Sequence, residues 1–151
     1  KLAHLGPEPL ADDFTPEVFY KMLRSKNRQI KPLLLDQTFL AGLGNIYVDE
    51  ALFQAGIQPL SIAASIPKRQ SMSLHAAIQS ILSASIKAQG TTILNFSHGE
   101  NESGTYQAAL QVYGRKDEPC LVCETPITKI TVGQRGTHFC SSCQSLFKAK
   151  R

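Results

Sequence analysis

Hydrophobic residues recur with a helical period over much of the first two thirds of the chain. Between Leu74 and Ile86 they are spaced three to four residues apart, which predicts an amphipathic helix whose apolar stripe faces a core. Pro67 is a suitable first residue for this helix, and Gly90 is a suitable stop just after Gln89. The pattern therefore predicts one long helix over about residues 67–89.

Shorter helices are predicted before it. Thr15 followed by Pro16 is a helix start, because a hydroxyl can cap the first turn and proline costs nothing there. The apolar stretch 32–43 predicts a short buried helix. The short turns at residues 42–44, Gly-Leu-Gly, then lead into another helix.

That next helix has clear signals at both ends. Asn45 can cap its start, and the helix is expected to run to about Ala55. Gly56 supplies the C-terminal stop before a proline. Residues 95–107 are polar, with neither a helical nor a strand period, and predict a mobile loop.

After Tyr113 the composition changes to cysteine, threonine and β-branched residues. We therefore place a domain boundary there, with a helical domain over 1–113 and a smaller module over 114–151. The predicted fold class is mostly α with a small β-hairpin zinc finger.

All four cysteines lie in this second module, as two Cys-x2-Cys pairs sixteen residues apart. This is the spacing of a zinc ribbon, and four thiolates complete a tetrahedral Zn²⁺ site that is structural because no position is left for water. Two disulfides or a redox dithiol are the alternatives, but neither an oxidising compartment nor a βαβ setting is indicated. The expected ligands of one structural zinc ion are Cys120, Cys123, Cys140 and Cys143.

The residues between the two pairs predict a β-hairpin. Residues 126–132 have strand character, residues 133–136 form the predicted turn, and residues 137–139 return. This interpretation places Arg135 at the tip of the turn, where its guanidinium can bind phosphate oxygens. An ordinary exposed turn arginine is the alternative.

The composition excludes several classes of protein. Hydrophobic residues make up 42% and charged residues 19%, which is ordinary globular usage. The sequence has neither a membrane-length apolar run nor a signal-peptide layout, so we expect a soluble cytoplasmic protein. The chain begins at Lys1 rather than methionine, so we expect a segment or domain upstream.

Positive charge is unevenly distributed. The net charge of +4 arises from the second module, which holds seven basic and three acidic residues, while residues 1–113 hold nine of each. Residues 21–31 nevertheless contain five cations and no acid, which makes them candidate phosphate contacts or simply a solvated face. Asn45, at a helix start after two glycines, is a further candidate phosphate site.

Three stretches carry a resemblance to a known family: KPLLLDQTFLAGLGNIYVDEALFQAGI, GTYQAALQVYGRKDEPC, and CLVC followed by QRGTHFCSSC. In this order, over nearly the whole chain, they closely resemble the C-terminal part of bacterial formamidopyrimidine-DNA glycosylase. The resemblance implies a helix-two-turn-helix domain followed by a four-cysteine zinc ribbon. Endonuclease VIII shares this architecture, but the long loop before QVYGR favours the formamidopyrimidine type.

The resemblance implies base excision repair, in which 8-oxoguanine and formamidopyrimidines are removed from double-stranded DNA and the abasic sugar is then eliminated. The family's proline nucleophile, with its assisting glutamate and lysine, belongs to an N-terminal domain that we do not find in this chain. We therefore expect the intact parent to be a DNA glycosylase/AP lyase, and this chain alone to bind damaged DNA without catalysing the reaction.

Roles carry over only at matching positions. Arg135 matches the zinc-finger arginine that contacts phosphate and donates a proton in δ-elimination, which makes it the expected catalytic residue. The segment 97–107 matches the lesion-capping loop, with Gly104 and Thr105 as the expected contacts to the flipped base. The expected DNA-binding residues are Lys26, Arg28, Lys31, Asn45, Tyr47 and Arg135.

Two other functions stay open at this point. The chain is alternatively a stand-alone zinc-dependent module that binds nucleic acid or protein, or part of an endonuclease VIII-like glycosylase. The main interpretation predicts a monomer with one zinc ion, DNA carrying an oxidised purine or an abasic site as its partner, no membrane contact, and a bacterial, nucleoid-associated location in the cytoplasm.

Overall fold

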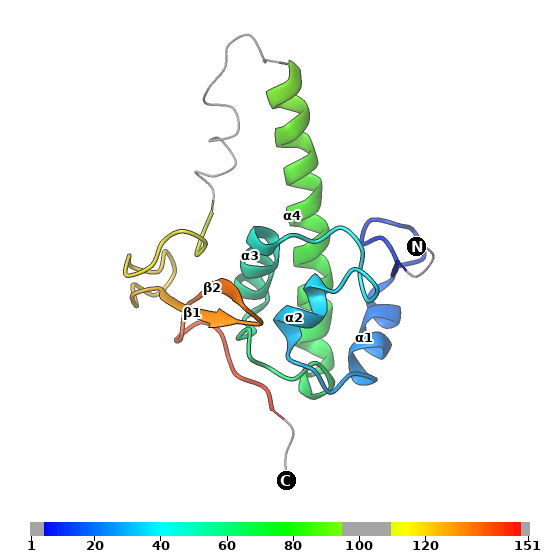
Figure 1. The fold of residues 1–151 in the computed structure, drawn as a ribbon, viewed down its shortest axis with the longest axis horizontal. Coiled ribbons are helices and arrows are strands. Elements are labelled where there is room, and N and C mark those ends of the chain that lie inside the picture. Colours follow the sequence, from blue (N-terminus) through cyan, green and yellow to red (C-terminus); the bar gives the residue numbers. More distant parts are fainter. Residues whose placement is uncertain (1–4, 95–109, 149–151) are drawn as a thin grey trace.

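The computed structural model describes residues 5–94 and 110–148, with side chains described for 5–86 and 110–148. Figure 1 shows the long helix α4 beside α1 and α3, with a two-stranded hairpin next to α2 and α3. The mostly α fold with a small β-hairpin is confirmed. In chain order, the elements are α1 (Pro16–Arg24), α2 (Ile30–Leu35), α3 (Asn45–Ala55), the 3-10 helix η1 (Ala63–Ser65), α4 (Lys68–Leu94), β1 (Thr128–Val132) and β2 (Arg135–Phe139).

Helix α1 begins where the sequence predicts. The Thr15 hydroxyl accepts a hydrogen bond from the Val18 amide at 3.2 Å, and proline occupies the first turn. Phe19 and Leu23 face inward and are fully buried. Both the predicted start of this helix and its predicted apolar face are therefore present in the structure.

Helix α4 is longer than predicted. It begins at Lys68, but it continues through Gly90 to Leu94. Glycine ends a helix when its backbone turns left-handed, as Gly56 does after α3 with φ of 75°. Gly90 instead keeps the helical conformation, so the predicted end at residue 89 is wrong by five residues.

The segment between α2 and α3 forms the predicted pair of turns. Helix α2 runs from Ile30 to Leu35. Of the helix expected over 32–43, only residues 32–35 are therefore helical in α2, and the true helix begins two residues earlier. Gly42, with φ of 90°, supplies a backbone conformation that other residues adopt only with strain. Gly44 then caps α3.

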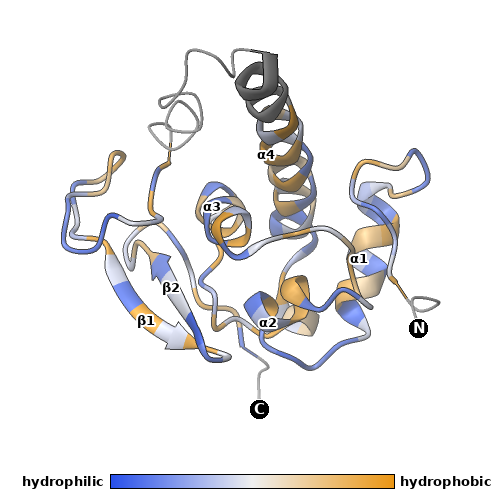
Figure 2. Cartoon of the chain, turned by 45° about the horizontal axis from the view of Figure 1, so that its top comes forward, coloured by the Kyte–Doolittle hydropathy of each residue, from blue (hydrophilic) through white to orange (hydrophobic). Residues whose placement is uncertain are grey.

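The main core lies among the four helices. Among the residues whose side chains are described, it consists of twenty buried apolar residues, to which all four helices contribute. Hydrophobic residues lie along these helices in Figure 2, whereas β1 alternates between hydrophilic and hydrophobic positions. The core packs α3 against α4, and α3 carries four of the residues described below, Asn45, Tyr47, Asp49 and Glu50.

The zinc finger has a smaller core of its own. Phe53 from α3 packs there with Val112, Ile127 and two of the cysteines. The chain after the finger returns to the helices, because the Gln58 amide donates to the Ser145 carbonyl at 2.8 Å and the Ile62 amide donates to the Phe147 carbonyl at 2.7 Å. The finger is thus attached to the helical part along several segments.

Candidate nucleic-acid interface and metal centre

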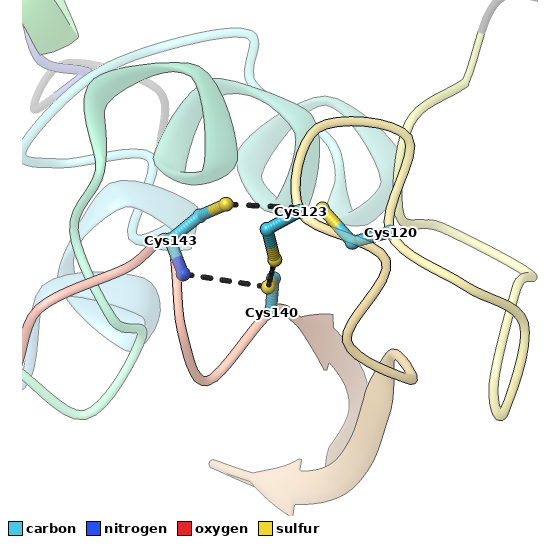
Figure 3. Close-up of side chains that lie close together, drawn as sticks. All are labelled: Cys120, Cys123, Cys140 and Cys143. Atoms are coloured by element: carbon cyan, nitrogen blue, oxygen red, sulfur yellow. Dashed lines mark hydrogen bonds between the residues drawn. The ribbon is translucent and has the colours of Figure 1, made fainter.

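The four cysteine sulfurs converge on one point between the two Cys-x2-Cys turns (Figure 3). All four Sγ atoms lie within 4.8 Å of one another, with 3.4 Å between Cys123 and Cys140 and 3.8 Å between Cys120 and Cys143. A tetrahedron with Zn–S bonds of about 2.3 Å has sulfurs about 3.8 Å apart. The donor set therefore fits one zinc ion.

Burial and hydrogen bonding act differently on the individual thiols of the cluster. Burial raises the pKa of the Cys140 and Cys143 thiols, which disfavours thiolates there without a nearby positive charge. Hydrogen bonding with Thr125 lowers the pKa of the exposed Cys123 to about 6. The Val122 and Cys143 amides each donate to a cysteine sulfur at 3.4 Å, as suits metal-bound thiolates.

The hairpin turn differs from the prediction in its length. Gly133 and Gln134, with φ of 57° and 68°, form a two-residue turn in which both residues are left-handed. Arg135 is therefore the first residue of β2, paired with Val132, rather than the tip of a four-residue turn. Its side chain is exposed and remains available to a phosphate.

Asn45 lies close to this hairpin, but it is not the N-cap residue of α3 that the sequence predicts. Gly44 is the N-cap of α3, and Asn45 is the first helical residue, without a capping bond from its side chain. Its Nδ2 instead donates to the carbonyl of Gly136 at 3.2 Å. Its Oδ1 is buried without a hydrogen-bond partner. The first turn of α3 and the residue after Arg135 are thus in direct contact.

Lys31 is the clearest departure from the expected phosphate contacts. Its side chain is fully buried, and its three ammonium donors reach Asp49 Oδ1 at 2.7 Å, the Gly136 carbonyl at 3.0 Å and Thr137 Oγ1 at 2.9 Å. A lysine has only three such donors. Lys31 is therefore unavailable to a phosphate, and the expectation of direct contact is wrong because tertiary packing buries it.

Asp49 completes this buried group. Its other oxygen, Oδ2, accepts from the His138 amide at 2.9 Å, and His138 Nδ1 lies 3.4 Å away. Burial lowers the pKa of Lys31 and raises the pKa of Asp49, while the pairing opposes both shifts. Sequence reasoning missed this group, although the acidic pair Asp49-Glu50 inside an otherwise apolar helix is a signal for it.

The remaining expected DNA contacts are Lys26, Arg28 and Tyr47. Lys26 and Arg28 are exposed and line a pocket of about 260 Å³ between α1 and the turn after α2. Arg28 also pairs with Asp36 at 2.9 Å, so part of its charge is compensated. Tyr47 is half-buried, and its hydroxyl accepts from Ser85 Oγ on α4 at 2.8 Å.

The expected lesion contacts Gly104 and Thr105, and the segment 97–107, lie outside the described residues. The chain that follows them is held by Glu50 of α3. Its two carboxylate oxygens accept from the amides of Gln111, Val112 and Tyr113 at 2.8–2.9 Å. Sequence reasoning missed this carboxylate, which fixes the position of residues 111–113 against α3.

Comparison with family models decides the relationship. Residues 5–97 match the formamidopyrimidine-DNA glycosylase H2TH domain, and residues 117–146 match the zinc finger found in FPG and IleRS. The chain belongs to the formamidopyrimidine-DNA glycosylase family. The match confirms the resemblance. The zinc-finger match and the four-cysteine cluster together suit one structural zinc ion.

Individual relatives of this family agree. The chain is 48% identical to the formamidopyrimidine-DNA glycosylase of Bacillus licheniformis over 143 residues and 50% identical to that of Cytobacillus firmus, in both cases with 95% of this chain covered. It spans 52% of the length of each. The chain thus corresponds to about half of the curated relatives that it matches.

Solved structures of the family match as well. A Lactococcus lactis formamidopyrimidine-DNA glycosylase bound to DNA containing an AP site superposes with a TM-score of 0.81 at 42% identity, covering 94% of this chain and 50% of that chain. A MutM complex with DNA containing carbocyclic 8-oxo-G also gives 0.81, at 44% identity, with 94% and 51% covered. Separately, no helix in the part of the chain that the structure describes is long and apolar enough to cross a membrane.

Proposed function

We propose that this chain is the DNA-binding part of a base-excision-repair glycosylase/AP lyase that acts on oxidised purines. Its partner is double-stranded DNA that carries 8-oxoguanine, a formamidopyrimidine or an abasic site. The resemblance implies that the family's proline nucleophile belongs to the part of the relatives outside the matched stretch, and we propose that the residues of this chain contribute DNA binding rather than the nucleophile. Binding to chromosomal DNA would place the protein on the bacterial nucleoid.

One observation carries the proposal: Asn45, in the first turn of α3, donates to the carbonyl of Gly136, the residue directly after the exposed Arg135. A helix N-terminus presents free amides and the positive end of its dipole, and a guanidinium binds phosphate oxygens through paired N–H groups. Two anion-binding groups side by side suit the backbone on either side of an extruded nucleotide. Such contacts position DNA without identifying the base.

The chain's own residues then have distinct roles. Asn45 and the α3 amides hold one phosphate, and Arg135 holds a neighbouring one and assists the departure of phosphate during elimination. Lys26 and Arg28 add charge to the backbone contacts, and Tyr47 supports the first turn of α3 from the side of α4. Residues 97–107, with Gly104 and Thr105, cover the flipped base. Zinc supplies only the folding of the finger.

The test is binding of the zinc-loaded chain, as a monomer, to a duplex with a stable abasic analogue and to the undamaged duplex across a salt series. We expect weak, steeply salt-dependent binding with little preference between the two duplexes. Arg135→Ala should lower the slope of log affinity against log salt by about one. Lys116→Ala, which removes an exposed lysine paired with Asp117, is the control with little effect.

Other outcomes discriminate among the functions. Absence of salt-dependent binding to either duplex would contradict the proposal and favour a protein-binding zinc module. For the intact parent, preferential release of oxidised pyrimidines rather than purines would assign it to the endonuclease VIII type.

A further inference from the structure

The zinc finger and the helical part meet through a small buried polar group, here called the joint. It consists of Lys31 from α2, Asp49 from α3, and the stretch of β2 formed by Gly136, Thr137 and His138. Both Lys31 and Asp49 side chains have no exposed surface, and their charged atoms lie 2.7 Å apart. The mechanism proposed above gives neither side chain a contact with DNA.

Hydrophobic attachment alone does not explain this group. A buried ion pair is desolvated at considerable cost, and well-packed apolar residues of similar size usually hold two elements together at least as well. Hydrogen bonds, unlike apolar contacts, fix direction and register. The joint therefore contributes a fixed direction and register of β2 relative to α2 and α3.

The joint fixes a particular stretch of β2. The Gly136 carbonyl, Thr137 Oγ1 and the His138 amide each bond to Lys31 or Asp49, at 3.0, 2.9 and 2.9 Å. These are the three residues directly after Arg135. Thr137 Oγ1 also donates to the Arg135 carbonyl at 2.9 Å.

The other side of the joint is the helix that begins the proposed phosphate site. Asp49 lies four residues after Asn45 on α3, hence on the same face of the helix. Asn45 bonds to the same Gly136 carbonyl that Lys31 does. A shift of β2 by one residue would move Arg135 by about 3.3 Å, which is enough to break a guanidinium–phosphate contact.

We infer that the buried Lys31–Asp49 pair is a positioning device, which sets Arg135 at a fixed place relative to the first turn of α3 so that both bind one DNA backbone. This inference rests on the proposed DNA-binding function. The far end of β2 is fixed by Cys140 in the metal cluster, and the joint fixes the near end. Zinc therefore fixes only the far end of β2, and the position of the near end relative to α3 depends on the joint together with the Asn45–Gly136 hydrogen bond.

A double-mutant cycle tests the inference. The double substitution Lys31→Met/Asp49→Asn removes the charged pair and leaves no buried lone charge, while an asparagine oxygen can still accept from the His138 amide. It is combined with Arg135→Ala in the zinc-loaded chain. The readouts are affinity for an abasic-analogue duplex, its salt slope, thermal unfolding and zinc content.

If the pair positions Arg135, the pair variant and Arg135→Ala should each weaken binding about tenfold and lower the salt slope by about one. The triple variant should then be no more than about twofold weaker than either. Unfolding temperature and zinc content of the pair variant should stay close to the parent, which separates positioning from loss of fold. Asn45→Ala, in contrast, should weaken binding further in every background.

The inference is overturned if Arg135→Ala still weakens binding about tenfold in the pair-variant background. If Arg135→Ala has no effect in the parent chain, the proposed phosphate contact fails instead, so the two failures are distinguishable. Should the pair variant fail to load zinc, the isosteric Thr137→Val removes one acceptor of Lys31. Thr137→Val should weaken DNA binding in the parent chain but not in the Arg135→Ala variant. An equal loss of affinity in the parent chain and in the Arg135→Ala variant would overturn the inference.

Discussion

The helical part and the zinc finger differ in how much hydrophobic core each contains. In the described part of the chain, twenty buried apolar residues form the main cluster among the helices, whereas five form the cluster of the finger, two of them cysteines. A small module with so few apolar residues needs an additional source of stability, and a metal site is the usual one. The two parts should therefore respond to different perturbations, although they share α3.

The largest expected effect is removal of the metal. A structural zinc site contributes on the order of 10 kcal/mol to folding, far more than the finger's small core. Chelation should therefore unfold about residues 115–145 first and leave the helices in place. Amide hydrogen exchange followed along the chain checks this, and a hairpin that stays fully protected after chelation would contradict the structural role of zinc.

The reverse perturbation targets the helical core. Leu34 is fully buried in the main cluster, and Leu34→Ala should lower the free energy of unfolding by about 2–5 kcal/mol through lost burial and a cavity. Zinc content should change little below the unfolding transition. Chemical denaturation followed by circular dichroism measures the effect, with the exposed Leu121→Ala in the finger as the matched control.

A third change loosens the connection between the two parts. Glu50→Gln replaces a carboxylate that accepts three amides with a side chain that has one oxygen. We expect a loss of about 1–3 kcal/mol, because a buried donor is left without its partner. Hydrogen exchange at residues 111–113 should accelerate. Equal protection there in the parent and the variant would rule out the anchoring role, and Glu118→Gln on the surface is the control.

A smaller effect is the pH dependence of the stability of the helical part. Hydrogen bonds from Thr38, and then from Arg28, hold the pKa of Asp36 at about 2, below its usual value of 3.8. A lowered folded-state pKa stabilises the fold above pH 3.8, and this contribution is lost as the pH falls through about 2. Asp36→Asn should therefore cost about 1 kcal/mol near neutral pH and less at pH 2. Helix unfolding measured across this range in parent and variant checks the direction.

The smallest effect concerns backbone strain in the finger. Glu124 follows the first cysteine pair with φ of 70°, a conformation that only glycine adopts freely. Glu124→Gly should change stability by less than about 1 kcal/mol, because relief of strain and the added freedom of the unfolded chain oppose each other. Glu124→Val should destabilise the finger by about 0.5 kcal/mol, because a β-branched side chain tolerates a positive φ less well than glutamate does. Zinc-loaded thermal unfolding compares the two, and equal stabilities would show that the strain is negligible.

Local sequence signals predict helix ends and motifs well where the conformation depends on residues close together in the sequence. Thr15 and Gly56 mark the ends of their helices as predicted, and the spacing of the cysteines predicts a convergent cluster. The same reasoning is wrong at Gly90, where a glycine continues the helix. It also predicts a four-residue turn over 133–136, whereas two left-handed residues are enough.

The candidate site is predictable only in part. The helix start and the hairpin are both predictable from the sequence, so Asn45 and Arg135 are both candidates. The hydrogen bond from Asn45 to the Gly136 carbonyl, next to Arg135, is not predictable from the sequence. The charge of Lys31 suggests a phosphate contact, yet Lys31 is the buried partner of Asp49. A run of cations does not reveal which members face solvent, because burial depends on residues more than one hundred positions away.

The sequence by itself determined the helices, the zinc-binding cysteines and the family, since these depend on short-range periodicity, caps and motif spacing. Only the tertiary structure decided that Lys31 is internal, that Asn45 reaches across to Gly136, and that Glu50 anchors the chain after residue 109. Each of these contacts joins segments distant in sequence. Their formation depends on how the hairpin packs against α2 and α3, which no local pattern specifies.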